Sequence, residues 1–172
     1  MARITLFRHA KAETPTRATS DFDRGLAARG RRNADRMGRF IARHDLLPDL
    51  VIVSPAARTR QTHELACAHW PDIPVIYRDS IYEASATTIL TAIQSLGADR
   101  ERVMVIGHNP GLAVLLGQLV EAPPPDADLF YFPTSCVAAI GLDATTIGEI
   151  AEESGRLISL VRVRELGESD PL

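Results

Sequence analysis

Short apolar runs, each followed by a turn and then a helical pattern, constrain the fold of this chain more than any other feature. The runs are rich in β-branched residues and cover residues 4–7, 50–53, 74–77 and 103–106. Such runs are typical of strands that a parallel sheet buries on both faces. Between and after them, apolar residues recur at helical spacing over residues 26–41, 56–69, 89–96 and 112–119. Two later apolar runs, 136–142 and 157–163, are also predicted to be strands.

This alternation of strands and helices predicts a three-layer α/β/α sandwich around a mostly parallel sheet. The chain has 172 residues, a length that suits one domain, and no repeat or linker divides it. We therefore expect a single domain over residues 1–172. The polar stretch from Lys11 to Arg24 is predicted to be a loop over the end of the first strand. Gly97 should end one helix, and Pro110 should open the next.

Composition argues against several classes of function. The formal net charge is −3 at pH 7, whereas a nucleic-acid-binding protein would carry a strong basic excess. The arginines are concentrated between Arg17 and Arg43, so a local basic face stays open. No apolar run reaches the length of a membrane span, and Arg8 to Lys11 interrupts any signal peptide. We expect a cytoplasmic protein without nucleic-acid or membrane partners.

The cysteine count argues against a disulfide framework or a zinc cluster. The chain has two cysteines, Cys67 and Cys136, and both are expected to be reduced and mostly buried thiols.

Two histidines follow strands at matching places in the sequence. His9 follows the first apolar run and lies directly after Arg8, and His108 closes the run that begins at Val103. In open α/β sheets, sites form beyond the carboxyl ends of the strands, so both histidines should face one crevice. Either histidine alone would more often be a packed or surface residue. The pair, with an arginine beside the first histidine, indicates a site.

Arg58 adds a further basic group at a third strand end. It lies four residues after Ser54, where the run 50–53 stops, and should therefore occupy the first turn of a helix. Guanidinium groups match phosphate oxygens bidentately, and a helix start adds backbone donors. We predict that these residues form a pocket for a dianionic phosphoryl group without a metal or cofactor: Arg8, His9, Arg58 and His108. Glu83, in a predicted loop, is either exposed or a proton donor at the pocket edge.

Other kinds of phosphate chemistry lack their motifs. There is no G-x-x-x-x-G-K-[ST] loop, and neither cysteine precedes an arginine at the spacing of a thiolate-based phosphatase. Asp21-Phe22-Asp23 resembles an aspartyl-phosphate nucleophile pair. No apolar strand precedes it, however, so an ordinary loop is predicted there. His44, His63 and His69 have polar neighbours in or near helices and are predicted to be solvated.

Taken in order, the motifs of the chain resemble those of the histidine phosphatase superfamily, which has the phosphoglycerate-mutase-like fold. Leu6-Phe7-Arg8-His9-Ala10 is similar to its signature, and Lys11 and Ala12 after it resemble the phosphohistidine phosphatase branch typified by the bacterial SixA proteins. Later segments fit that branch in the same order: Asp23-Arg24-Gly25-Leu26 with Gly30, Ser54-Pro55 with Arg58, Gln61 and Thr62, Gly107-His108-Asn109-Pro110-Gly111, and Phe132-Pro133-Thr134-Ser135. The similarity covers nearly the whole chain. The chain lacks the cap insertions that larger members of the superfamily carry.

The resemblance implies a role for each pocket residue. His9 would be the nucleophile, attacking phosphorus in its neutral form, and water would hydrolyse the phosphohistidine intermediate. Arg8, Arg58 and a protonated His108 would neutralise the phosphoryl oxygens. Glu83 fits the usual acid position only loosely, and Ala10 replaces the superfamily's commoner glycine.

Without a cap, the pocket should be shallow and open, which favours a side chain presented by another protein. A protonated phosphohistidine leaves easily, so this substrate tolerates a weak acid at Glu83. The expected partner is a phosphohistidine-bearing protein of signalling or phosphocarrier type, with further contacts on the arginine-bearing face of the helix at 26–41. Two alternatives stay open: a small-molecule phosphomonoesterase of the same superfamily acting on a small phosphate ester, and a non-catalytic phosphate-binding module. The complete set of pocket residues argues against the second.

Overall fold

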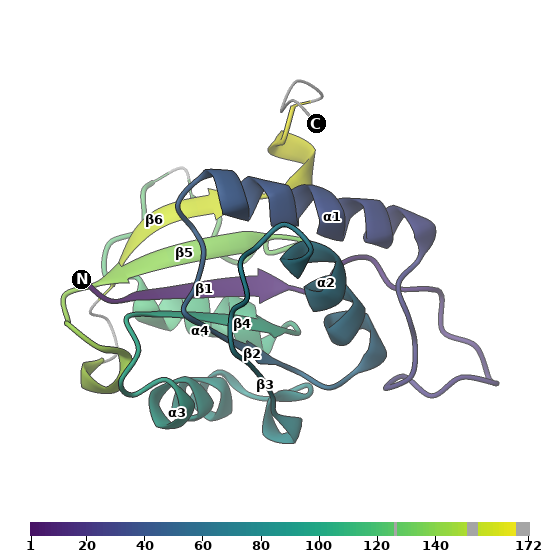
Figure 1. Cartoon of the computed structure of the whole chain (residues 1–172), viewed down its shortest axis with the longest axis horizontal. Helices are drawn as coiled ribbons and strands as arrows, with labels where there is room; N and C mark the ends of the chain where they lie inside the picture. The colour runs from purple at the N-terminus through teal and green to yellow at the C-terminus, as the bar shows by residue number, and fades with distance from the viewer. Residues whose placement is uncertain (126, 151–154, 168–172) are drawn as a thin grey trace.

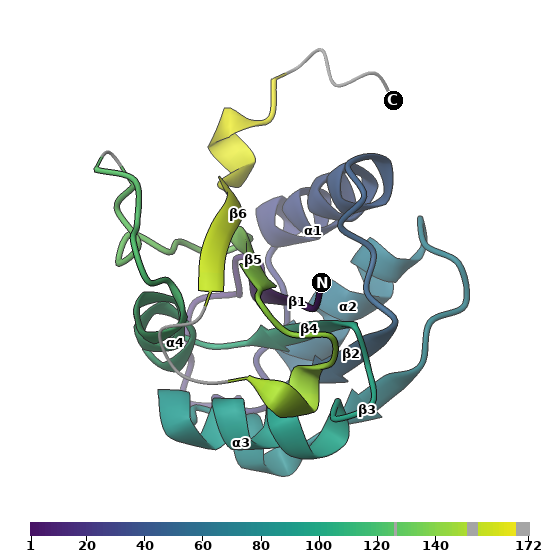
Figure 2. The same ribbon diagram turned by 90° about the vertical axis from the view of Figure 1, so that its left-hand side faces the viewer.

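A six-stranded sheet between two helical layers forms the centre of the computed structural model, which describes residues 1–125, 127–150 and 155–167 (Figure 1). The strands are β1 (Arg3–Arg8), β2 (Leu50–Val53), β3 (Val75–Tyr77), β4 (Arg102–Gly107), β5 (Val137–Leu142) and β6 (Gly155–Val161). The α-helices are α1 (Ala28–Arg43), α2 (Ala57–Cys67), α3 (Ala86–Leu96) and α4 (Gly111–Leu119). Short 3-10 helices cover Asp79–Ile81, Ile147–Glu149 and Val163–Glu165. Figure 2 shows α1 and α2 on one face of the sheet and α3 and α4 on the other, which confirms the three-layer prediction.

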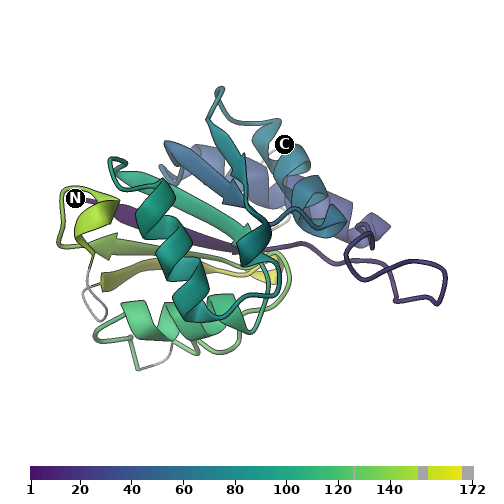
Figure 3. The same ribbon diagram turned by 90° about the horizontal axis from the view of Figure 1, so that it is seen from below.

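The sheet is mostly parallel, as predicted. Its strand order is β3-β2-β4-β1-β5-β6, and the pairs β3–β2, β2–β4 and β4–β1 are parallel. β5 and β6 extend the sheet with antiparallel pairings, a direction that the sequence analysis did not assign. Because β2, β4 and β1 are neighbours and run the same way, their carboxyl ends lie side by side at one edge of the sheet. The long loop after β1 projects from this same end (Figure 3).

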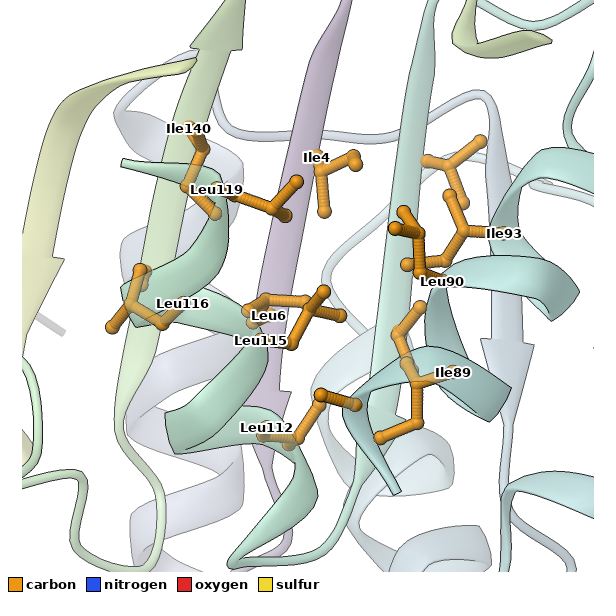
Figure 4. Close-up of a cluster of buried hydrophobic side chains, with 14 of the residues drawn as sticks. Ile4, Leu6, Ile89, Leu90, Ile93, Leu112, Leu115, Leu116, Leu119 and Ile140 are labelled. Atoms are coloured by element: carbon orange, nitrogen blue, oxygen red, sulfur yellow. The ribbon is translucent and has the colours of Figure 1, made fainter. Parts of the chain in front are cut away.

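The central strands are buried on both faces because successive side chains point to opposite sides of the sheet. On one face, Ile4 and Leu6 of β1 lie beneath the leucines of α4 and the isoleucines of α3 (Figure 4). On the other face, Phe7 belongs to a second cluster that includes Met37 and Ile41 of α1. Packing on both faces fixes the sheet, and the sheet in turn fixes the carboxyl ends of β1, β2 and β4.

The helix boundary predicted at Gly97 is confirmed, and the one predicted at Pro110 is wrong by one residue. Gly97 does follow the last residue of α3, but its φ of −108° is not left-handed. A glycine is needed there for space, since a Cβ would lie 2.6 Å from the Cγ2 of Val103. Pro110 is the N-cap residue of α4, and the helix begins one residue later, at Gly111.

The prediction that His44, His63 and His69 are solvated is wrong for His63, whereas His44 is exposed and His69 is half-buried. His63 is buried, and its ring packs edge-on against Trp70 and Tyr77. The Nε2 atom of His69 lies 2.7 Å from the Oδ1 atom of Asp35 on α1. Polar neighbours in sequence do not reveal this burial, because α2 packs one of its faces against α1 and the sheet.

The described residues bear on two further predictions, those on the cysteines and on membrane spans. Cys136 is buried and Cys67 is half-buried, and neither forms a disulfide. In the described part of the chain, no helix has the length and apolar character needed to cross a membrane. The cytoplasmic location and the single domain over residues 1–172 stay predictions.

Candidate active site

The carboxyl ends of three neighbouring strands bring the predicted basic residues together. His9 follows β1, His108 follows β4, and Arg58 lies in the first turn of α2 just after β2. The ring centroids of His9 and His108 are 5.2 Å apart. One guanidinium nitrogen of Arg58, Nη2, lies 3.3 Å from the Nδ1 atom of His108. The sheet order thus places side chains that are some 50 and 100 residues apart in sequence in one site.

His9 is held in one tautomer by the backbone. Its Nδ1 atom lies 2.8 Å from the carbonyl oxygen of Ala10. A carbonyl can only accept, so Nδ1 carries the proton and Nε2 keeps a free lone pair. Burial, the largest cause, and the positive charges of Arg58 and Arg8 together lower the pKa of His9 to about 4, although the hydrogen bond to Ala10 opposes the shift. The ring is therefore neutral at pH 7 and offers Nε2 as a nucleophile.

His108 is also neutral in the free site, and its protonation against a bound phosphoryl group stays a prediction. Burial, followed by the proximity of His9 and Arg58, lowers its pKa to about 3. Arg58 can only donate, so Nδ1 of His108 accepts its hydrogen bond. The Nε2–H group of His108 then donates to the Oγ atom of Ser54 at 2.7 Å. The sequence analysis placed cations beside His108, but sequence spacing gave no sign of the burial that is the largest cause of this low pKa.

Arg58 is the most deeply buried charge of the site, with 2% of the residue exposed. Its Nη1 atom donates to the backbone carbonyl of Asp21 at 2.7 Å, and its Nη2 atom donates to the Asp21 carboxylate at 3.0 Å. The Asp21 carboxylate also accepts from the hydroxyl of Tyr82 at 2.8 Å. Hydrogen bonds from Arg24 and Tyr82, together with Arg58, hold the pKa of Asp21 well below its usual range. A carboxylate therefore lies against the guanidinium that is expected to bind phosphate.

Arg8 is positioned by the segment before β5. Its Nη1 atom donates to the carbonyl of Phe132 at 2.9 Å, and the side-chain amide of Asn109 donates to the same oxygen at 2.9 Å. The backbone N–H of Ser135 lies within hydrogen-bond distance of the carbonyls of both Arg8 and His9. This segment therefore fixes the end of β1 and one guanidinium at once.

Glu83 lies at the edge of the site. Its Oε1 atom is 3.7 Å from the Nη2 atom of Arg58, and its side chain is 59% exposed. The backbone of Glu83 has a φ of 47°, in the left-handed region that few side chains adopt. Strain of this kind is often found at functional sites. Glu83 is thus exposed and lies at the pocket edge, and its role as a proton donor stays a prediction.

Some residues that shape the site were not predicted from sequence. Asp21, in the segment predicted to be an ordinary loop, contacts Arg58, and Tyr82 holds Asp21 from the opposite side. Ser54 accepts a hydrogen bond from His108, and Thr62 joins α2 to the segment after His9 by accepting a hydrogen bond from the Ala10 N–H at 3.0 Å. Ser54 could have been found, because it directly follows a strand. The path of the loop that carries Asp21 leaves no signal in the sequence.

The described residues hold no cluster of three or more histidine, cysteine, aspartate or glutamate side chains suited to a metal ion. Burial raises the pKa of the Cys136 thiol to about 12, so this side chain is not a thiolate nucleophile at neutral pH. The chemistry that these groups can support is phosphoryl transfer to a neutral imidazole beside two guanidinium groups.

Comparison with known proteins identifies the family. The model of the histidine phosphatase superfamily (branch 1) matches residues 4–90. An uncharacterised protein of Mycobacterium tuberculosis is 33% identical over 139 residues, covering 77% of this chain and 85% of that protein. The chain belongs to the histidine phosphatase superfamily. The matched range contains Arg8, His9, Arg58 and Glu83, whereas His108 lies outside it and reaches the site through the sheet order.

Solved structures of other histidine phosphatases share the fold. A protein from Agrobacterium tumefaciens, named as a candidate phosphohistidine phosphatase SixA, is 30% identical, with a TM-score of 0.77 over 94% of this chain and 97% of that one. A SixA candidate from Nakamurella is 27% identical, with a TM-score of 0.80 over 94% and 95% of the two chains. A candidate α-ribazole-5′-phosphate phosphatase from Escherichia coli, 16% identical with a TM-score of 0.65, shares the fold alone, over 94% of this chain and 97% of that one. The predicted fold and the SixA resemblance are thereby confirmed.

Proposed function

We propose that this histidine phosphatase is a metal-independent phosphohydrolase in which His9 is the nucleophile. The observation that carries the proposal is the hydrogen bond between His9 and the carbonyl of Ala10, at 2.8 Å. This hydrogen bond fixes the proton on Nδ1 and leaves a free lone pair on Nε2, beside Arg58 and His108. An imidazole held neutral in this way needs no general base before it attacks phosphorus.

The reaction proceeds in two displacements. The Nε2 atom of His9 forms a bond to phosphorus while the bond to the leaving group breaks, and the leaving group takes the electron pair. Water then attacks the phosphorus of phospho-His9, which releases inorganic phosphate and restores the neutral ring. Arg8 and Arg58 stabilise the negative charge on the phosphoryl oxygens in both steps.

His108 enters this scheme as a neutral residue. In the free site its Nδ1 atom accepts from Arg58, and burial keeps its pKa near 3. A bound dianionic phosphoryl group would raise that pKa, because an opposite charge nearby favours the protonated ring. His108 would thus contribute a full positive charge only when the substrate is present, as an interaction that strengthens on the way to the transition state.

We propose protein phosphohistidine as the substrate. A phosphorylated imidazole departs as a neutral ring once it is protonated, so it asks little of a general acid. The only carboxylate at the edge of the described site other than Asp21 is Glu83, which is exposed and lies near Arg58 rather than in a buried acid position. The names given to the two SixA candidates from Agrobacterium and Nakamurella support this choice.

A small-molecule phosphomonoesterase is the second candidate, and the position of Glu83 favours it. A carboxyl group 3.7 Å from a phosphate-binding arginine is within reach of the leaving oxygen of a bound ester. An alkoxide leaves poorly without a proton, so an ester substrate would depend on Glu83.

Comparison of substrates tests the proposal. We expect kcat/KM to be larger for a phosphohistidine protein than for a sugar phosphate, and we expect Glu83→Gln to slow aryl and alkyl esters more than phosphohistidine. A large preference for the sugar phosphate would establish the second candidate. EDTA should leave both activities unchanged, whereas inhibition that added metal reverses would contradict a metal-independent reaction.

A further inference from the structure

A basic groove of about 280 Å³ lies beside the phosphoryl site. It is lined by the start of α1, by the segment before β5 and by the chain after β6. Its lining includes Lys11, Arg29, Tyr131, Thr134, Arg162 and Arg164. The whole chain has a net charge of −3, so this gathering of four cations runs against the overall charge.

The groove adjoins the proposed active site through the backbone. Lys11 lies two residues after His9. The carbonyl of Tyr131 accepts from the Nε atom of Arg162 at 3.1 Å, while the next carbonyl, that of Phe132, accepts from Arg8 at 2.9 Å. Neighbouring residues of one short segment therefore contact the groove, through Tyr131, and the phosphoryl site, through Phe132.

Within the described part of the chain, three of the four cations that line the groove have no acidic partner. Arg162 is paired with Glu165, at 3.2 Å. Across the described residues, no acidic side chain lies within ion-pair distance of Lys11, Arg29 or Arg164. Unpaired cations gathered along one groove produce a positive potential that attracts anionic groups.

An aromatic side chain gives the groove a firm wall. The guanidinium groups of Arg162 and Arg164 lie 5.2 and 5.0 Å from the ring centroid of Tyr131. Tyr131 is 45% exposed. An exposed aromatic group beside arginines is typical of protein-binding surfaces. A small polyanion would make no use of this ring, whereas a peptide chain would.

We propose that this groove binds an acidic segment of the protein that presents the phosphorylated side chain. The inference rests on the proposed function, and it adds the feature that selects the substrate. Aspartate or glutamate side chains flanking the phosphohistidine would pair with Arg29 and Arg164 while the phosphoryl group enters between Arg8 and Arg58. From sequence, substrate contacts were expected along the arginine-bearing face of the helix at 26–41. The proposal places these contacts in the first turn of α1, at Arg29.

Two synthetic peptides of equal length test the groove. Each carries one phosphohistidine, introduced with potassium phosphoramidate, flanked in one peptide by Asp and Glu and in the other by Asn and Gln. We expect the acidic peptide to have a kcat/KM about tenfold higher at low salt, since several exposed ion pairs of modest strength add up. The preference should shrink as the ionic strength rises.

Charge reversal in the groove supplies the matched comparison. Arg29→Glu with Arg164→Glu should abolish the preference for the acidic peptide and leave hydrolysis of free phosphohistidine unchanged. The control is Arg31→Glu with Arg156→Glu, which changes the net charge equally at exposed positions outside the groove. Arg31 lies about 200° around α1 from Arg29, and Arg156 is at the opposite end of β6 from Arg162. The control should keep the preference.

Several outcomes would overturn the proposal. It fails if the wild type shows no preference, if the groove variant keeps it, or if the groove variant loses free phosphohistidine hydrolysis to the same extent. Binding of the unphosphorylated acidic peptide, followed by fluorescence anisotropy, gives a readout that does not depend on turnover. If that peptide binds the wild type and not the groove variant while no phosphohistidine compound is hydrolysed, then the proposed function fails and the groove stands.

Discussion

At the scale of single residues, hydrogen bonds give the two site histidines opposite tautomers. His9 carries its proton on Nδ1 because Ala10 presents a carbonyl there, whereas His108 carries its proton on Nε2 because Arg58 occupies Nδ1. The first arrangement offers Nε2 as a nucleophile, and the second fixes a ring that can take up a proton when a dianion arrives. Sequence motifs identify both rings but not their tautomers, since these depend on the partner atoms in the fold.

The low pKa values of these rings predict how stability depends on pH. An unfolded histidine has a pKa near 6.5, whereas folding lowers the pKa of His9 to about 4 and that of His108 to about 3. As the pH falls below about 6.5, the unfolded chain takes up protons that the folded protein refuses, so the free energy of unfolding decreases. Between about pH 7.5 and pH 5, this amounts to roughly 2 kcal/mol for each ring.

Denaturant unfolding at the two pH values measures this loss. His9→Gln combined with His108→Gln removes both titrating rings, so the double variant should lose markedly less stability than the wild type between the same pH values. Equal losses in the two proteins would show that the rings keep ordinary pKa values in the fold.

The charged residues of the phosphoryl site should act mainly in the transition state. Arg58→Ala, Arg8→Ala and His108→Ala should each lower kcat by about 10²–10³, the usual cost of losing one preorganised donor. Substrate affinity for a protein substrate should change less, because most of its contacts lie outside the pocket. Steady-state kinetics separates the two effects, and a variant that retains the full kcat would remove its residue from the site.

At the scale of elements, the loop between β1 and α1 covers Arg58, the arginine that we propose binds the phosphoryl group. Asp21 engages both terminal nitrogens of Arg58, and the ring of Phe22 packs edge-on against Tyr82. A phosphoryl dianion bound to Arg58 would therefore meet a carboxylate already in place. The position of this loop over the site was predicted from sequence, but its contact with Arg58 was not.

Removal of the Asp21 charge should strengthen anion binding. Asp21→Asn keeps a polar side chain near Arg58 and removes the repulsion between two like charges, so tungstate should bind about three- to tenfold more tightly. Asp23→Asn, two residues along the same exposed loop and without a contact to Arg58, is the control. Titration calorimetry distinguishes the outcomes: weaker binding by Asp21→Asn would mean that Asp21 chiefly holds Arg58 in position.

Close packing between α1 and α2 gives a second prediction at this scale. A Cβ on Gly38 of α1 would lie 2.4 Å from the carbonyl oxygen of Ala66 on α2, so Gly38→Ala must push the helices apart. We expect a loss of about 1–3 kcal/mol in the free energy of unfolding. Gly117 of α4 is the matched control, because a Cβ there would meet only the ring of Phe130, at 3.7 Å. Gly117→Ala should raise stability by about 0.5–1 kcal/mol, and similar effects of the two changes would contradict the packing argument.

At the scale of the whole molecule, the fold was largely predictable because its signals are local. Apolar runs and helical spacing mark the strands and helices, and one topological rule places His9, His108 and Arg58 at the same edge of the sheet. The parts that could not be predicted arise from contacts between distant segments. The burial of His63, the contact of Asp21 with Arg58 and the neutral state of His108 all depend on how loops and helices pack over the sheet.

The central claim is that His9 carries the phosphoryl group. Rapid quenching of the enzyme with a phosphohistidine substrate, followed by peptide mass spectrometry, tests it directly. The account predicts an acid-labile phosphoryl group on His9 of the wild type, and neither this adduct nor turnover in a folded His9→Ala variant. Undiminished turnover by His9→Ala, or a phosphoryl group trapped on another residue, would contradict it.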